Sequence, residues 1–80
     1  MSINETDFKT ALQDDGAALR LAVAYELLIA PGLGMTVVGP ESGRGEISEP
    51  HGSDPMAATR RAIVAVARAV SKLQTIALAA

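Results

Sequence analysis

Residues 55–78, PMAATRRAIVAVARAVSKLQTIAL, decide the fold, because they are the longest stretch of the chain that reads as one regular element. The stretch has no glycine and no proline after Pro55, and a proline suits the first turn of a helix. Ser53 or Asp54, directly before it, can cap the helix with a side-chain oxygen. The sequence therefore predicts a long C-terminal helix.

This helix has two different faces. Apolar residues at helical spacing predict a buried face made of Ile63, Val66, Ala67, Val70, Leu73 and Ala77. Arg61, Arg68 and Lys72 fall within about 40° of one another on the opposite side at ~100° per residue. Such a basic stripe can contact phosphates or an acidic protein surface. It can equally be the solvated face of an amphipathic helix.

Two further helices are expected before it. Asn4 can cap a first helix at residues 4–13, and a second helix is expected at residues 15–30, where Pro31 and Gly32 end it. The second helix is apolar on most sides. A helix of this kind lies either at the centre of a fold or at a subunit contact, as in a homodimer.

The segment between the helices has a different composition. Residues 31–54 contain six of the seven glycines and three of the four prolines. Residues 35–38 and 46–48 favour strands, and a long polar loop separates them, so we expect a β-hairpin at about residues 35–48. The predicted fold is α+β and mainly helical, a single domain over residues 1–80 in the order helix, helix, β-hairpin, helix.

Charge is segregated along the chain. Residues 1–54 contain nine acidic and three basic residues, a net charge of −6, whereas residues 55–80 contain four basic residues and no acidic one, a net charge of +4. The total of −2 thus conceals a separation that predicts a dipolar molecule able to steer a charged partner. This pattern points to binding.

The composition excludes several kinds of site. Without cysteine, and with His51 as the only histidine, the chain can form neither a disulfide framework nor a thiolate or multi-histidine zinc site. Glu49, His51 and Ser53 are neighbours in sequence, but no nucleophile elbow accompanies them, so we expect a loop or capping role for His51 and no catalysis, cofactor or metal. No apolar run is long enough for a membrane span and no secretory signal is recognisable. We expect a cytoplasmic protein.

Two short segments resemble a known family. Gly32-Leu33-Gly34 and, further on, Glu49-Pro50-His51-Gly52-Ser53-Asp54-Pro55 look like the corresponding segments of isopropylmalate and isocitrate dehydrogenases. In that family the second segment contacts the adenosine part of a nicotinamide cofactor, so the resemblance implies a nucleotide beside His51. Nothing in the chain corresponds to the family's substrate arginines, catalytic lysine and tyrosine or metal-binding aspartates. The resemblance therefore does not imply that chemistry.

In size and character the chain resembles the small inhibitor proteins of phages and other mobile elements, including those of the anti-CRISPR type. That resemblance implies a non-catalytic, stoichiometric inhibitor that blocks a surface of a larger protein or ribonucleoprotein complex that handles nucleic acid. The alternative is a small nucleic-acid-binding module that uses the basic C-terminal helix. Because four basic residues lie beside nine acids, we expect direct nucleic-acid binding to be weak.

Two sets of residues are candidates for partner binding. One is the basic stripe of Arg61, Arg68 and Lys72. The other is the acidic loop side, made of Glu41, Arg44, Glu46, Glu49 and Asp54.

Overall fold

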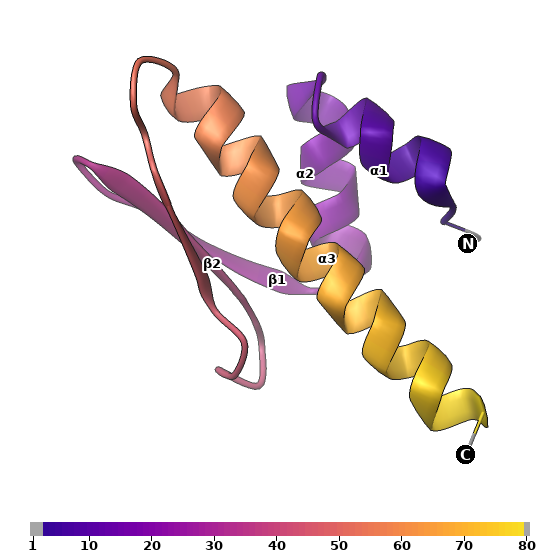
Figure 1. The fold of residues 1–80 in the computed structure, drawn as a ribbon. Helices are drawn as coiled ribbons and strands as arrows, with labels where there is room; N and C mark the ends of the chain where they lie inside the picture. Colours follow the sequence, from indigo (N-terminus) through magenta and orange to yellow (C-terminus); the bar gives the residue numbers. More distant parts are fainter. Residues whose placement is uncertain (1–2, 80) are drawn as a thin grey trace.

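The structure, a computed structural model, describes the backbone of residues 3–79 and the side chains of residues 3–74. Its elements are α1 (Glu5–Ala11), α2 (Asp15–Ala24), β1 (Leu27–Pro31), β2 (Met35–Pro40), β3 (Ile47–Pro50) and α3 (Pro55–Ala79), shown in Figure 1. The expected α+β fold and its order of helix, helix, hairpin, helix are confirmed. A third strand, β1, joins the hairpin.

The helix starts are set by local side chains. Asn4 accepts the Asp7 N–H at 3.1 Å, and the Asp7 carboxylate accepts the Asn4 N–H at 2.8 Å, so α1 begins with a capping box. Asp14 caps α2 by accepting the Ala17 N–H at 2.9 Å. Asp54 caps α3 in the same way, accepting the Ala57 N–H at 3.0 Å. Short polar residues therefore fix where each helix begins.

The expectation of a second helix over residues 15–30 is wrong beyond Ala24. Tyr25 leaves the helical region at ψ 5°, and Glu26 adopts a left-handed conformation at φ 56°, which ends the helix without a glycine. The residues that follow, Leu27–Pro31, form β1. Pairing with β2 offers these residues backbone hydrogen bonds and a half-covered apolar surface, and this tertiary gain outweighs their compatibility with a helix.

The strands form an antiparallel sheet in the order β1-β2-β3. β1 and β2 are joined by a tight turn at Leu33 and Gly34, where the Gly32 N–H donates to the Met35 carbonyl at 2.8 Å. β2 and β3 form the expected hairpin, with Val38 opposite Ile47 and Met35 opposite Pro50.

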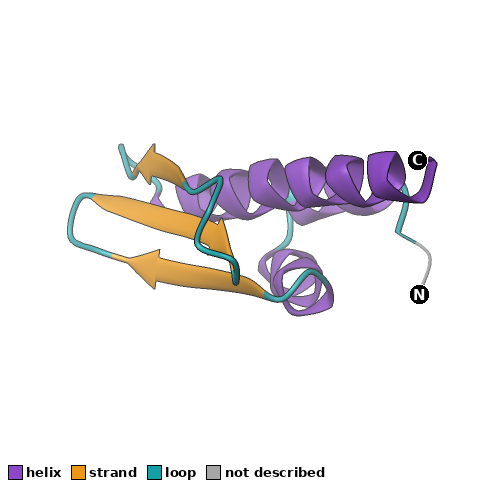
Figure 2. Ribbon diagram, turned by 90° about the horizontal axis from the view of Figure 1, so that it is seen from below, coloured by secondary structure: helices purple, strands orange, loops and turns teal. Residues whose placement is uncertain are grey.

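α3 is the central element of the molecule. It packs against all three strands on one side and against α1 and α2 on another. In Figure 2, α2 is seen end-on beside the sheet while α3 extends across the view. The core joins these parts through Phe8, Ala11, Ala18, Leu21, Ala22, Val38, Ala62, Ile63, Val64, Val66 and Ala67. Most of these side chains are small, so the helices lie close together.

The predicted buried face of α3 is confirmed over its first four turns. Ile63, Val66 and Ala67 are buried, and Val70 packs against the core from its edge. Leu73, however, is 66% exposed, so its assignment to the core is wrong. A helix of 25 residues is about 37 Å long. It sets the 41 Å long axis of the molecule and outruns the elements that could cover Leu73. Ala77 lies outside the described side chains.

Candidate functional site

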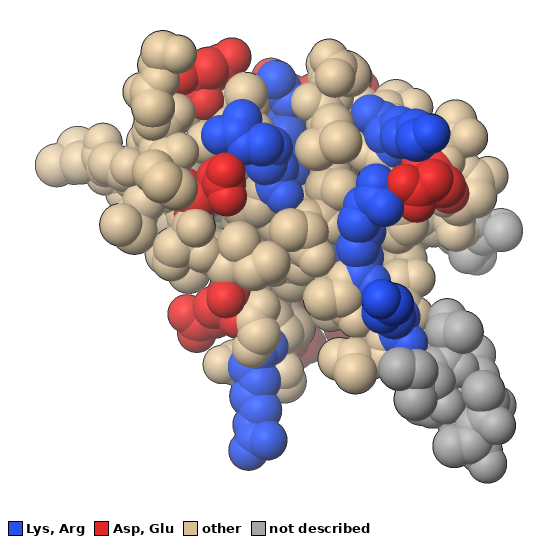
Figure 3. Space-filling view, viewed as in Figure 1, with Lys and Arg blue, Asp and Glu red and all other residues tan. Residues whose placement is uncertain are grey.

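Arg61, Arg68 and Lys72 all lie on the exposed side of α3, as expected from their spacing. Two of them are nevertheless held within the molecule. Arg61 Nε lies 2.9 Å from the Glu49 carboxylate, and an Arg68 guanidinium nitrogen lies 2.7 Å from that of Glu5. Figure 3 shows basic side chains over α3 lying beside acidic ones. The basic stripe is therefore partly neutralised.

Arg68 and Arg60 make further contacts within the molecule. The Arg68 guanidinium lies 5.1 Å from the centre of the Phe8 ring, a cation–π distance. Arg60 donates through Nε to the Leu12 carbonyl at 3.0 Å and pairs with the Asp15 carboxylate. Arg60 thus ties the connection between α1 and α2 to α3.

The charge separation along the sequence is only partly a separation in space. Ion pairs join Arg60, Arg61 and Arg68 of α3 to acids of three earlier segments. The physical reason is the central position of α3, which brings its arginines within reach of acids throughout residues 1–54. The dipolar molecule expected from the sequence is thereby reduced.

The residues of the acidic loop side divide into two groups. Glu49 pairs with Arg61, and Asp54 caps α3. Glu41, Arg44 and Glu46 are exposed in the β2–β3 loop, and the described residues offer them no ion pair. This free charged group is called the loop cluster below. Lys72 is likewise exposed without a described ion pair.

His51 takes part in a chain of side-chain hydrogen bonds. Its Nε2 lies 2.7 Å from Thr36 Oγ1, which lies 2.8 Å from Thr59 Oγ1. Thr59 Oγ1 donates to the Pro55 carbonyl at 2.9 Å. At first sight, a hydroxyl so close to an imidazole nitrogen looks like a nucleophile and its base.

The direction in which these hydrogen bonds are donated contradicts that interpretation. The only hydroxyl proton of Thr59 goes to a carbonyl, so Thr59 must accept from Thr36. Thr36 then has no proton left for His51, and His51 Nε2 must be the donor. In this arrangement Nε2 cannot take a proton from Thr36, whose side chain is also fully buried. These hydrogen bonds join β2 and the segment after β3 to the start of α3.

One face of the sheet has no helix over it. Paired residues of antiparallel strands point to the same side, so the register assigns one set of side chains to α3 and the other to the opposite side. The first set includes the buried Thr36 and Val38. The second set, called the outer sheet face below, comprises Leu28, Ala30, Met35, Val37, Gly39, Ser48 and Pro50.

The outer sheet face is apolar and accessible. Leu28 is 60% and Met35 48% exposed. At one end the Glu46 side chain lies over Gly39, because a Cβ placed on that glycine would come within 2.8 Å of Glu46 Cγ. Glu46, a member of the loop cluster, thus borders this face. The sequence signal for this surface is the apolar run of β1, which fits a helix as well as a strand.

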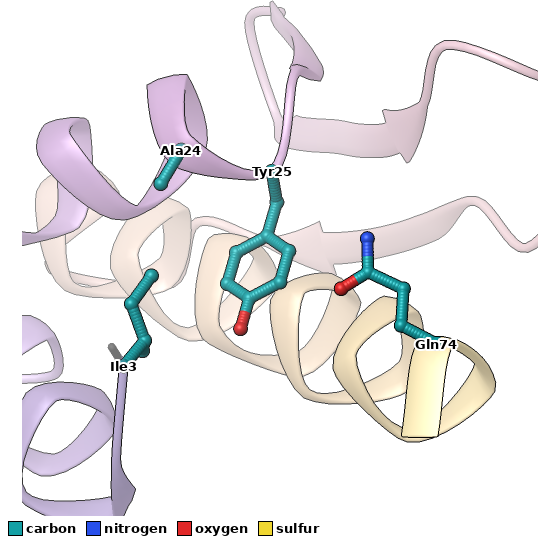
Figure 4. A pocket seen from close by; sticks show the side chains of 4 residues that line it. All are labelled: Ile3, Ala24, Tyr25 and Gln74. Atoms are coloured by element: carbon teal, nitrogen blue, oxygen red, sulfur yellow. The ribbon is translucent and has the colours of Figure 1, made fainter. Parts of the chain in front are cut away.

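Two shallow hollows lie between the helices. The one in Figure 4, about 300 Å³, is lined by Ile3, Ala24, Tyr25 and Gln74, and the tyrosine hydroxyl points into the gap between Ile3 and Gln74. A larger one of about 530 Å³ runs between α1 and α2 and is lined mainly by apolar side chains. The polar side chains in the lining of the larger hollow are those of Asp7, Thr10 and Arg20.

The described part of the chain was also searched for metal ligands and for membrane-spanning helices. No three His, Cys, Asp or Glu side chains gather there as metal ligands would. None of its helices has both the length and the apolarity to cross a membrane.

Comparison with known proteins found no match among family models, curated proteins or solved structures. The two segments that resemble the dehydrogenases do lie side by side, since the His51 N–H donates to the Gly34 carbonyl at 3.0 Å. Gly32–Gly34 nevertheless forms a hairpin turn and does not open a helix, so it provides no phosphate cradle.

Proposed function

We propose that this protein is a non-catalytic binding protein, a stoichiometric inhibitor of the anti-CRISPR type that blocks a surface of a larger protein or ribonucleoprotein complex. The complex would be one that handles nucleic acid, in the cytoplasm. The observation that carries the proposal is the loop cluster of Glu41, Arg44 and Glu46. Its charges are exposed and have no ion pair among the described residues, so a partner can engage them without first breaking an internal contact.

The hydrogen-bond chain of His51 favours a non-catalytic function. Thr36 is the one hydroxyl hydrogen-bonded to His51 in the described part of the chain, and it is fully buried. An active nucleophile must reach its substrate.

Binding through the acidic loop side is favoured over binding through the basic stripe. Of the basic stripe, Arg61 and Arg68 are engaged by Glu49 and Glu5, which leaves Lys72. In the loop cluster both carboxylates remain free. A negative loop can occupy a basic channel where nucleic acid would otherwise lie, and electrostatic steering would speed the encounter.

The alternative function is direct nucleic-acid binding through α3. It requires several free cations, because affinity for a phosphate backbone comes largely from released counterions. The ion pairs of Arg61 and Arg68 favour the inhibitor over this alternative.

The test begins with the partner that co-purifies with a tagged chain from its native host. Its dissociation constant is then measured for the parent, for Glu41→Lys combined with Glu46→Lys, and for Lys72→Glu. These variants leave every described ion pair intact. We expect the loop variant to weaken binding at least about tenfold, with a strong dependence on salt, and Lys72→Glu to change it by less than about threefold.

Binding to single-stranded and duplex DNA is measured in parallel. Sub-micromolar binding to DNA that Lys72→Glu abolishes would replace the inhibitor with the alternative function. His51→Ala serves as the control for catalysis. If it removes all activity while the protein stays folded by circular dichroism, the non-catalytic proposal is wrong.

A further inference from the structure

We propose that the outer sheet face docks a second copy of this chain, sheet against sheet, in a weak two-fold dimer. The starting observation is that the described elements cover only one side of the three-stranded sheet. Leu28 and Met35 are left largely exposed on the other side. The inference is independent of the proposed function, because the face is built from uncharged residues.

The charge of the face fits a second copy. In a two-fold contact the side chains close to the axis lie near the same side chains of the other copy, so a charge at the centre would be repelled by itself. None of the seven residues of the outer sheet face is charged. Glu46, the acid that borders the face, lies at one end of it, over Gly39.

The geometry of the sheet also fits. Two sheets with the same right-handed twist pack with their strands about 30° apart, and a second copy supplies an identical twist. A two-fold axis that crosses the strands at the row of Ala30, Val37 and Ser48 would place Val37 against Val37 of the other copy. The same axis would keep the two Glu46 carboxylates at opposite ends. The product is a four-layer arrangement with both sheets inside and a helix layer on each outer side.

The size of the face sets the strength of the contact. With a rise of ~3.3 Å per residue and ~4.8 Å between strands, a face three strands wide and five residues long covers about 240 Å² when drawn flat. Side-chain relief increases this area, but a stable dimer buries about 800 Å² per partner. We therefore expect an equilibrium between monomer and dimer that shifts with concentration.

The natural absence of cysteine allows a direct test of the axis. Val37→Cys places a single thiol at the predicted two-fold axis, and Leu19→Cys places one on the exposed surface of α2. Under mild oxidation at the same concentration we expect the Val37→Cys chain to form a covalent dimer at least about tenfold faster, because the thiols are held in register. Equal rates would overturn the proposal.

Sedimentation of the unmodified chain from about 10 µM to about 1 mM gives the second measurement. Leu28 and Leu19 are both 60% exposed, so Leu28→Lys and Leu19→Lys form a matched pair. We expect Leu28→Lys to weaken self-association at least about tenfold, because it replaces a large exposed apolar side chain of the outer sheet face by a charge, and Leu19→Lys to leave it unchanged. Circular dichroism verifies that both remain folded.

A chain that stays monomeric throughout this range overturns the proposal, and so does a dimer that only Leu19→Lys disrupts. The third negative outcome is a monomeric chain whose binding to the co-purified partner is lost in Leu28→Lys. That result would assign the face to a different protein.

Discussion

Val37 and Val38 are neighbours of the same residue type in the central strand, yet their surroundings differ completely. Val38 is fully buried beneath α3, whereas Val37 lies on the outer sheet face. The pattern of β2 cannot reveal this difference, because both of its faces carry apolar side chains. What buries Val38 fully and leaves Val37 only partly buried is the position of α3, an element 15 or more residues away in sequence.

The polar groups of the two faces also differ in their hydrogen-bond partners. The covered face contains Thr36, whose hydroxyl is shielded from water and bonded to both His51 and Thr59. On the outer face Ser48 is exposed and can bond to water. A polar group buried under a helix therefore needs a hydrogen-bond partner within the protein, and His51 and Thr59 are the partners of Thr36.

The largest effect expected from this comparison comes from adding a charge to each face in turn. Val38→Asp buries a carboxylate without a partner, which costs several kcal/mol in a domain whose total stability is about 5 kcal/mol or little more. We expect that variant to be largely unfolded and Val37→Asp to lose less than about 1 kcal/mol. Thermal melts followed by circular dichroism at low protein concentration provide the measurement. A cooperative, parent-like melt for Val38→Asp would mean that α3 covers the other face.

A smaller effect is expected from removing the buried hydroxyl. Thr36→Val keeps the shape of the side chain but leaves the His51 and Thr59 groups without their shared partner, at a cost of about 1–3 kcal/mol. Thr36→Ser keeps the hydroxyl and is the control. Urea unfolding measures both, and nitrogen NMR of the parent shows which ring nitrogen of His51 carries the proton. A proton found only on Nδ1 would refute the assignment of His51 Nε2 as the donor to Thr36.

Much of the fold was predictable from local chemistry. The caps by Asn4 and Asp54 and the apolar spacing of α3 act over a few residues, and the structure confirms them. The end of α2 was not predictable in this way. Glu26 adopts a left-handed conformation that favours glycine, so no local signal marked the break, and the strand that follows depends on a partner strand.

The candidate site was predictable only in part. Helical spacing correctly placed Arg61, Arg68 and Lys72 on the exposed side of α3. It could not show that Glu5 and Glu49 pair with two of them, because such pairs join residues 63 and 12 positions apart. The hydrogen-bond chain from His51 to Pro55 was not predictable for the same reason. Thr36 and Thr59 come together only when α3 packs on the sheet.

The smallest effect is expected from removing the ion pair of Glu49. This residue lies on β3, on the side of the sheet that faces α3. Its ion pair with Arg61 is partly solvated, with side chains 29% and 49% exposed. Arg61→Gln should therefore lower the free energy of unfolding by only about 0.2–1 kcal/mol, and added salt should shrink the difference. Urea unfolding at low and high salt measures this, with Lys72→Gln as the unpaired control. A loss as large as that of Thr36→Val would show that Arg61 belongs to the structural core, and charge reversal there could no longer serve to probe a binding surface.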